Sequence, residues 1–231
     1  MPKHTSKETA EEEAIVERIF DAVIDQRLAP GTKLSEAALC QAFGVGRMRV
    51  RRCLLLLASR DVVELQSNRG AYVASPTARQ ARDVFEARLA VEPSIARLAA
   101  LRASKADIKV LEKHVLAEST AHGAGDRHDA IRLSGQFHVV LAQVADNAVM
   151  LRMVKDLVTR SSLIIGMFGD AGAINCREDE HAGIIQALRS GNGSLAEQLM
   201  QGHLNHVKDH LDLHRPKGNS LDLAALFGAN R

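Results

Sequence analysis

Two short helix-forming segments followed by two β-prone runs lie within residues 35–74, and this order restricts the fold more than any other feature of the sequence. Ser35 is a suitable N-cap for a helix through Ala42, and Gly44-Val45-Gly46 then turns the chain. A second helix is expected from Arg47 to about Ser59, with Val50, Leu54 and Leu57 on its buried side. Helix, short turn and helix together predict a helix-turn-helix.

The next segment predicts a β-hairpin. Val62-Val63-Glu64-Leu65 and Ala71-Tyr72-Val73-Ala74 flank a turn that ends in Asn68-Arg69-Gly70. A helix-turn-helix followed by a two-stranded hairpin is a winged helix. Arg69 at the tip of the wing could enter a minor groove or meet a phosphate.

Four arginines crowd the start of the second helix, in the run Arg47-Met48-Arg49-Val50-Arg51-Arg52. Cations at a helix N-terminus are unfavourable in isolation, and a polyanion would offset that cost. Guanidinium groups and bare N–H groups suit a DNA phosphate or a guanine edge. The whole chain carries a net charge of only +2, so the positive charge is local, as a nucleic-acid footprint should be. The alternative is a solvated basic face without a partner.

The rest of the chain reads as helical. Aromatic residues make up only 3% of the sequence, and Leu and Ala dominate, which favours helices over sheets. We expect a mainly α protein with a disordered N-terminus at residues 1–12, a winged helix at 13–75, an all-α bundle at 76–215 that would serve dimerisation, and a tail at 216–231, in which residues 221–227 could dock as one more turn. Breaks in the pattern place the helices near residues 13–26, 77–102, 105–120, 127–146, 148–168, 176–190 and 194–214.

Three histidines are expected to face the interior of the bundle. Helical spacing puts His203 with Leu199 and Val207, and His181 with Ile184 and Leu188. His138 has small neighbours at Ser134, Gly135 and Ala142, which leave room beside its imidazole. Imidazoles from three helices could hold a divalent ion, Zn²⁺ first among the candidates and Ni²⁺ or a similar ion otherwise. The alternative is three separate core histidines that hydrogen-bond to backbone.

These residues resemble the GntR family of bacterial transcription regulators. Val45-Gly46-Arg47-Met48-Arg49-Val50-Arg51 occupies the place of the family's Val-Ser-Arg-Thr-Pro-Val-Arg motif, and Asn68-Arg69-Gly70-Ala71-Tyr72-Val73 resembles its wing. The helical half is similar to the FCD domain of the FadR subfamily, with Arg88, Glu92, Phe137-His138, Glu180-His181 and His203-Leu204 in the family's order. The resemblance implies DNA contacts at Arg47, Met48, Arg49, Arg51, Arg52, Arg69 and Gly70.

The resemblance also implies a metal on His138, His181 and His203, with a ligand pocket beside it. The family's metal pattern has an Asp one helical turn before the first His, where this chain has Ser134. An inward Arg at position 88 would hold the carboxylate of an organic acid, so Arg88 and Ser134 are the expected ligand-binding residues. The alternative for Arg88 is a simple i,i+4 ion pair with Glu92, worth about 0.3–0.5 kcal/mol.

The function that the sequence favours is a DNA-binding transcription regulator, a repressor rather than an enzyme. Its partners would be a double-stranded operator, a small carboxylate effector and a second copy of the chain in a homodimer. Two alternatives remain open: a metal-dependent all-α enzyme with a tri-His site, and a DNA-binding dimer without an effector. Three scattered cysteines and the lack of an apolar run of about 18 residues predict a cytoplasmic protein without a membrane partner. The resemblance implies that it is bacterial and nucleoid-associated through DNA.

Overall fold

The structure, a computed structural model, describes residues 3–24, 27–169, 178–213 and 226–227 of the 231-residue chain. The chain divides into two compact units, one of residues 1–75 with 216–231 and one of residues 76–215. Over the described residues, no helix is both long enough and apolar enough to cross a membrane.

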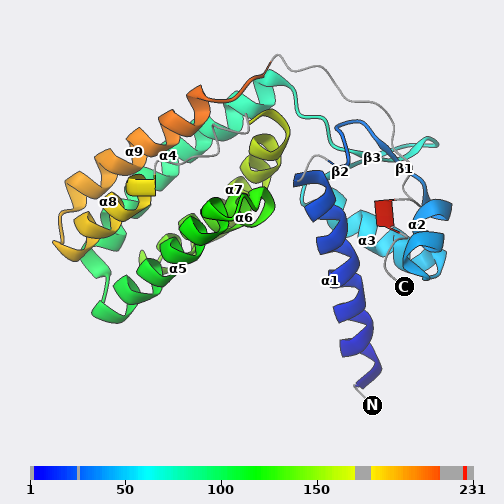
Figure 1. Cartoon of the computed structure of the whole chain (residues 1–231), viewed down its shortest axis with the longest axis horizontal. Helices are drawn as coiled ribbons and strands as arrows, with labels where there is room; N and C mark the ends of the chain where they lie inside the picture. Colours follow the sequence, from blue (N-terminus) through cyan, green and yellow to red (C-terminus); the bar gives the residue numbers. More distant parts are fainter. Residues whose placement is uncertain (1–2, 25–26, 170–177, 214–225, 228–231) are drawn as a thin grey trace. The chain divides into compact units, whose positions relative to one another are not determined.

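The first unit is a winged helix (Figure 1). Its elements are α1 (Lys3–Ile24), β1 (Lys33–Leu34), α2 (Glu36–Phe43), α3 (Arg47–Ser59), β2 (Val63–Gln66) and β3 (Gly70–Val73). The helix-turn-helix pair α2–α3 begins as predicted, because the Ser35 side chain accepts from the backbone N–H of Ala38 and Gly44 closes α2 in a left-handed conformation. The hairpin β2–β3 is antiparallel, with Val63 opposite Val73 and Gln66 opposite Gly70.

A third strand, β1, extends the hairpin into a sheet of order β1-β3-β2, and the sequence did not predict it. Lys33 lies opposite Tyr72 and Leu34 opposite Ala71. Two residues are too few to show the alternating pattern that identifies a strand. The pairing is nonetheless firm, since Leu34 is almost fully buried and the backbone N–H of Val73 donates to Thr32 O at 2.8 Å.

The N-terminal end of the first unit differs from the sequence expectation, whereas the contacts near the C-terminus agree with the expected docking of residues 221–227. Helix α1 begins at Lys3, whereas disorder was expected through residue 12. The residues before Ile15 are strong helix formers, and Glu11 and Glu12 make ion pairs with α3 that hold this turn in place. Near the C-terminus, in the expected tail, the Phe227 ring lies 5.1 Å from the Phe43 ring, and Arg18 Nη2 donates to Phe227 O at 3.2 Å.

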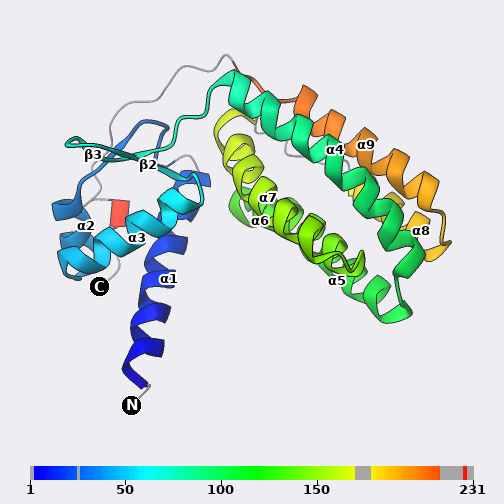
Figure 2. The same cartoon turned by 180° about the vertical axis from the view of Figure 1, so that it is seen from behind.

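The second unit is an all-α bundle, as the sequence predicted. Its helices are α4 (Ala78–Arg102), α5 (Lys105–Gly123), α6 (Arg127–Val144), α7 (Ala148–Phe168), α8 (Glu178–Arg189) and α9 (Gly193–Asp209). Helices α4 and α9 run side by side along the bundle (Figures 1 and 2). Capping boxes at Thr77 with Gln80 and at Ser104 with Asp107 fix the starts of α4 and α5.

The helix limits in the bundle differ from prediction by a few residues. Helix α5 runs on to Gly123 because the turn after it is made by Gly125, which has a φ of 71°. Helix α9 ends at Asp209 rather than 214, since Leu211 leaves the helix to make a bridge with Gly169. The predicted start of α8 at residue 176 lies outside the described residues.

Candidate functional sites

Helix α3 buries one face and presents its arginines on the other. Its buried residues are Val50, Cys53, Leu54 and Leu57, which include the three that the sequence predicted. Gly46 is the N-cap and supplies no side-chain hydrogen bond, so the first backbone N–H groups of α3 lack a side-chain cap. Arg47, Met48, Arg51 and Arg52 are all exposed on this helix. The first turn of α3 is therefore open to an anion.

The arginines of α3 differ in their ion-pair partners. Arg49 pairs with Glu11 at 2.6 Å and Arg52 pairs with Glu12 at 2.7 Å, both on α1. Arg51 donates through Nε to both oxygens of Glu36, at 2.9 and 3.1 Å. Within the described part of the chain, Arg47 makes no ion pair. None of these acidic partners was identified from the sequence.

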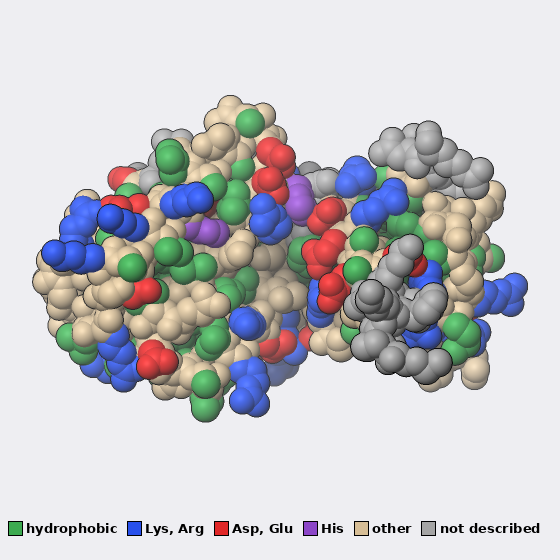
Figure 3. Space-filling view, turned by 90° about the horizontal axis from the view of Figure 1, so that it is seen from below, with side chains coloured by type: hydrophobic (Ala, Val, Ile, Leu, Met, Phe, Trp, Pro, Cys, Tyr) green, Lys and Arg blue, Asp and Glu red, His purple; other side chains and the backbone are tan. Residues whose placement is uncertain are grey.

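The wing places its basic tip in a defined turn. Asn68 has a φ of 60° and Gly70 a φ of 99°, and such positive values favour glycine at position 70. The Tyr72 hydroxyl donates to Arg69 O at 3.2 Å, which braces the turn while the Arg69 side chain stays exposed. The face drawn in Figure 3 carries Asp and Glu as well as Lys and Arg side chains, so it is not uniformly basic.

The three predicted histidines meet inside the bundle. His138 comes from α6, His181 from α8 and His203 from α9, and their exposed fractions are 3%, 2% and 2%. Their candidate ligand atoms all lie within 4.8 Å of one another. His203 Nε2 is 3.3 Å from His181 Nε2 and 3.3 Å from His138 Nε2. The interpretation of these residues as separate histidines bonded to backbone does not fit this convergence.

Each of the three imidazoles has a carboxylate behind it. His138 Nδ1 lies 2.6 Å from Glu92 Oε2, His181 Nδ1 lies 2.8 Å from Glu118 Oε2, and His203 Nδ1 lies 2.8 Å from Glu180 Oε2. An ionised carboxylate only accepts hydrogen bonds, so each Nδ1 carries the proton. The Nε2 atom of each ring then points toward the centre of the three-histidine group. Lone pairs at this distance repel unless a proton or a cation lies between them.

This donor set fits a divalent cation. Metal-binding histidines almost always donate their second ring N–H to a carboxylate or carbonyl, which fixes the tautomer and the ring orientation. Here Glu118 accepts from His181 Nδ1 and Glu180 accepts from His203 Nδ1, while a Glu92 oxygen lies 2.6 Å from His138 Nδ1. Three imidazole nitrogens suit Zn²⁺, Ni²⁺ and similar ions. The position of Glu118 behind His181 was not predicted from the sequence.

Burial keeps two of the rings neutral. Desolvation lowers the pKa of His138 to about 4 and that of His203 to about 3, against the partial compensation of Glu92 and Glu180. Burial would raise the pKa of Glu118, but the hydrogen bond and charge of His181 outweigh it and lower that pKa, with help from a hydrogen bond to Ser134. Ser134 therefore hydrogen-bonds to the carboxylate of Glu118, the residue that contacts His181, and is not itself an acidic residue of the site.

Acid should destabilise this bundle in a defined pH window. The unfolded chain protonates His138 and His203 below about pH 6.5, whereas the folded chain does so only near pH 4 and pH 3. The full contribution of the two neutral histidines to the free energy of unfolding is therefore present above pH 6.5, and it is lost progressively as the pH falls toward 4. Thermal midpoints measured with chelator at pH 7, 5.5 and 4.5 should decline, and more shallowly in His203→Gln. A flat midpoint across this window would contradict the neutral buried state.

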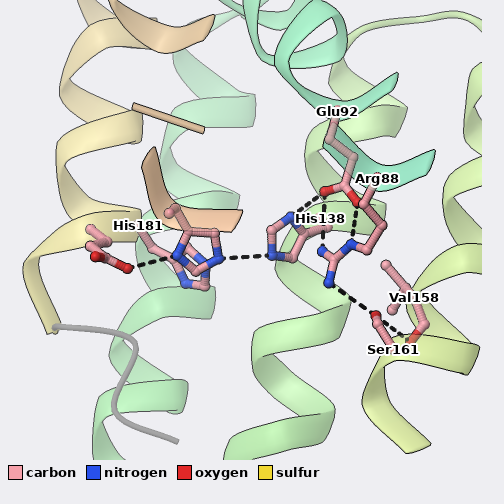
Figure 4. Close-up of polar contacts among 8 residues, drawn as sticks. Arg88, Glu92, His138, Val158, Ser161 and His181 are labelled. Carbon is pink, nitrogen blue, oxygen red and sulfur yellow. Dashed lines mark hydrogen bonds and ion pairs between the residues drawn. The ribbon is translucent and has the colours of Figure 1, made fainter. Parts of the chain in front are cut away.

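Arg88 donates hydrogen bonds to two side chains in a second buried polar cluster (Figure 4). It donates to Glu92 through Nε at 2.5 Å and through Nη2 at 3.2 Å, and to Ser161 Oγ through Nη1 at 2.9 Å. Burial would raise the pKa of Glu92, but the charges of Arg88 and His138 lower it. Arg88 is 3% exposed and Glu92 2%. The pair is thus an i,i+4 ion pair, as one interpretation expected, but a buried one joined to a histidine.

A small cavity of about 30 Å³ lies between Arg88 and the histidines. Its lining residues are Arg88, Ile131, Ser134, Gly135, His138, Ser161, Ser162, Ile165, His203 and Val207. Both predicted ligand-binding residues, Arg88 and Ser134, line it. The space suffices for about two water molecules. A Cβ at Gly135 would lie 2.9 Å from Ser162 Oγ and 2.9 Å from Val158 Cγ1, so glycine allows α6 to approach α7 closely beside this cavity.

Comparisons with known proteins identify the family. The profile of the bacterial regulatory proteins of the gntR family matches residues 11–73, and that of the FCD domain matches residues 83–206. The chain belongs to the GntR family of bacterial transcription regulators and carries an FCD domain. Family and relatives are regulators rather than enzymes, so the alternative of a tri-His enzyme is set aside.

Similar proteins include named repressors. The HTH-type transcriptional repressor RspR of Escherichia coli K12 is 27% identical over 183 residues, covering 79% of this chain and 80% of that protein. The galactonate operon transcriptional repressor of the same organism is 27% identical over 209 residues, covering 80% and 89%. A GntR regulator from Rhodococcus sp. RHA1 shares the fold, with a TM-score of 0.74, 22% identity, and coverage of 96% and 100%.

Proposed function

We propose that this protein is a ligand-responsive repressor. Its winged helix reads an operator, and its bundle holds one divalent ion on His138, His181 and His203 next to a site for a small organic acid. The observation that carries the proposal is the convergence of three Nε2 atoms, each from a ring whose Nδ1 lies within 2.8 Å of a carboxylate oxygen. When bound, the ion would supply a positive charge that attracts the effector's carboxylate.

The small cavity supports a link between effector binding and DNA affinity. An organic acid needs more space than about 30 Å³, so binding must move lining side chains or helices. Arg88 uses Nε, Nη1 and Nη2 in the bonds to Glu92 and Ser161, yet a guanidinium has five N–H groups, so two remain for a ligand. Arg88 would anchor the acid at one end and Ser134 would line the site beside the ion. The experiment is operator affinity against acid concentration, with metal-loaded and chelated protein.

The DNA-reading face would be the first turn of α3 together with the wing. Arg47 and Met48 are exposed above the uncapped helix start, Arg51 keeps both Nη groups outside its bonds to Glu36, and Arg69 with Gly70 forms the wing tip. Arg49 and Arg52 complete the set that the sequence predicted, and their ion pairs with α1 are considered below. One winged helix reads few base pairs, so we propose a homodimer on a short pseudo-palindrome.

Replacing Arg47 with Ala should cost about 1–3 kcal/mol of operator affinity and relax sequence preference at one position in each half-site. Its guanidinium is exposed and makes no ion pair within the described residues, so nothing must be broken before it contacts a base. Fluorescence anisotropy with the operator and with single-base variants measures both effects. The same titration should give two protomers per operator. Unchanged affinity, or one protomer per operator, would contradict the respective part of this proposal.

A further inference from the structure

Two arginines of α3 are tied to consecutive glutamates of α1. Arg49 Nη1 lies 2.6 Å from Glu11 Oε2, and Arg52 donates from Nε to Glu12 Oε1 at 2.7 Å. The Arg49 side chain is 23% exposed and that of Glu12 is 13% exposed, so both pairs are partly desolvated.

The glutamates are held in place by the packing of α1 on α3. Ile15, Val16 and Ile19 of α1 are buried, which fixes the rotation of the helix. The Cys53 thiol donates to the backbone oxygen of Glu12 at 3.7 Å. This contact also fixes the position of α1 along the axis of α3. The carboxylates of Glu11 and Glu12 are therefore held beside the two guanidinium groups by the fold.

A DNA phosphate would have to displace these carboxylates to reach Arg49 or Arg52. Each phosphate that a protein neutralises contributes about 0.9 to the slope of log affinity against log salt concentration. An arginine that is already neutralised contributes little to that slope, and a nearby carboxylate repels the backbone. Arg51 is different, because Glu36 engages only its Nε and its side chain is 57% exposed.

We propose that Glu11 and Glu12 are specificity-determining residues that withhold Arg49 and Arg52 from the phosphate backbone. The inference rests on the proposed role of α3 in reading DNA. The extra arginines would otherwise raise affinity for every sequence alike, since phosphate contacts carry no sequence information. With them neutralised, binding depends on Arg47, Arg51 and Arg69, and the ratio of specific to non-specific affinity rises.

The test is a Glu11→Gln/Glu12→Gln variant of the full chain, titrated with operator and with a random duplex of equal length at several salt concentrations. We expect tighter binding to the random duplex, a salt slope steeper by up to about 1.8, and a smaller specificity ratio. Adding Arg49→Gln and Arg52→Gln to this variant should reverse the change in slope. Gln keeps the size of Glu, and a circular dichroism melt confirms folding.

Glu17→Gln is the matched control. Glu17 also lies on α1 and pairs with an arginine at the C-terminal end of α3, Arg60, at 3.0 Å. This variant removes one negative charge from α1, where the double variant removes two, and it releases neither Arg49 nor Arg52, so its salt slope should stay near that of the wild type. An equal steepening in Glu17→Gln, or no steepening in the double variant, would overturn the inference. If Arg47→Ala also left operator binding intact, the proposed DNA face itself would fail, which separates the two outcomes.

Discussion

Replacing Arg88 with Met should lower the free energy of unfolding of the bundle by about 3–5 kcal/mol. Glu92 is 2% exposed and would lose the Nε and Nη2 donors of Arg88 while remaining in the core. Breaking a buried ion pair from one side leaves an uncompensated charge, which costs far more than the pair contributes on a surface. For a unit of this size the loss corresponds to a fall of roughly 10 °C in the thermal midpoint.

A matched exposed pair provides the control. Arg132 pairs with Asp129 on α6 at 2.9 Å, and both side chains are more than 40% exposed. Arg132→Met should cost under about 1 kcal/mol. In the double variant Arg88→Met/Glu92→Gln the uncompensated charge is gone, so part of the stability should return. A cost for Arg88→Met as small as that for Arg132→Met would show that the Arg88–Glu92 pair is not buried as the structure has it.

Metal affinity should fall about 10- to 100-fold in Glu118→Gln. A glutamine carbonyl can still accept from His181 Nδ1, but it lacks the negative charge that makes the ring a stronger ligand. Ser134→Asp should act in the opposite direction, because it returns the anionic residue of the family's usual pattern beside the histidines. The same change should weaken the binding of an anionic effector, since the charge of the ion would be more fully neutralised.

Competition with a chromophoric chelator measures these affinities in one series. His210→Ala is the control, because His210 lies at the exposed end of α9 and bonds to the backbone oxygen of His206. Its affinity should match that of the wild type. Equal affinities in the wild type, Glu118→Gln and Ser134→Asp would mean that neither position acts on the ion.

The winged helix and the bundle could be predicted because their signals are local. Gly44-Val45-Gly46 interrupts two apolar stripes, and Gly and Asn clusters separate the bundle helices. Strand β1 could not be predicted, because two residues acquire strand geometry only from β3. The start of α1 was placed ten residues too late for the same reason. Its first described side chains are polar, and the arginines that pair with Glu11 and Glu12 lie on another helix.

At the candidate site, too, features that depend on neighbouring residues could be predicted, and contacts between distant segments could not. Helical spacing alone indicated that His138, His181 and His203 face inward, and the structure brings them together. The carboxylates behind them come from α4, α5 and α8, so no single stretch of sequence contains the set. Glu118 did carry one signal, since it lies seven residues after Leu111 on an otherwise apolar stripe. A charged residue at a buried helical position indicates a partner across the core.

Native mass spectrometry of the protein purified without chelator tests the central claim most directly. The proposed repressor should carry one divalent ion per protomer in the wild type and none in His181→Ala, while both proteins stay folded. The ion should also leave as the pH falls, because protons compete with the metal for the imidazole nitrogens. A wild-type protein that stays metal-free with added Zn²⁺ at neutral pH, and still releases its operator when the acid effector binds, would contradict the account.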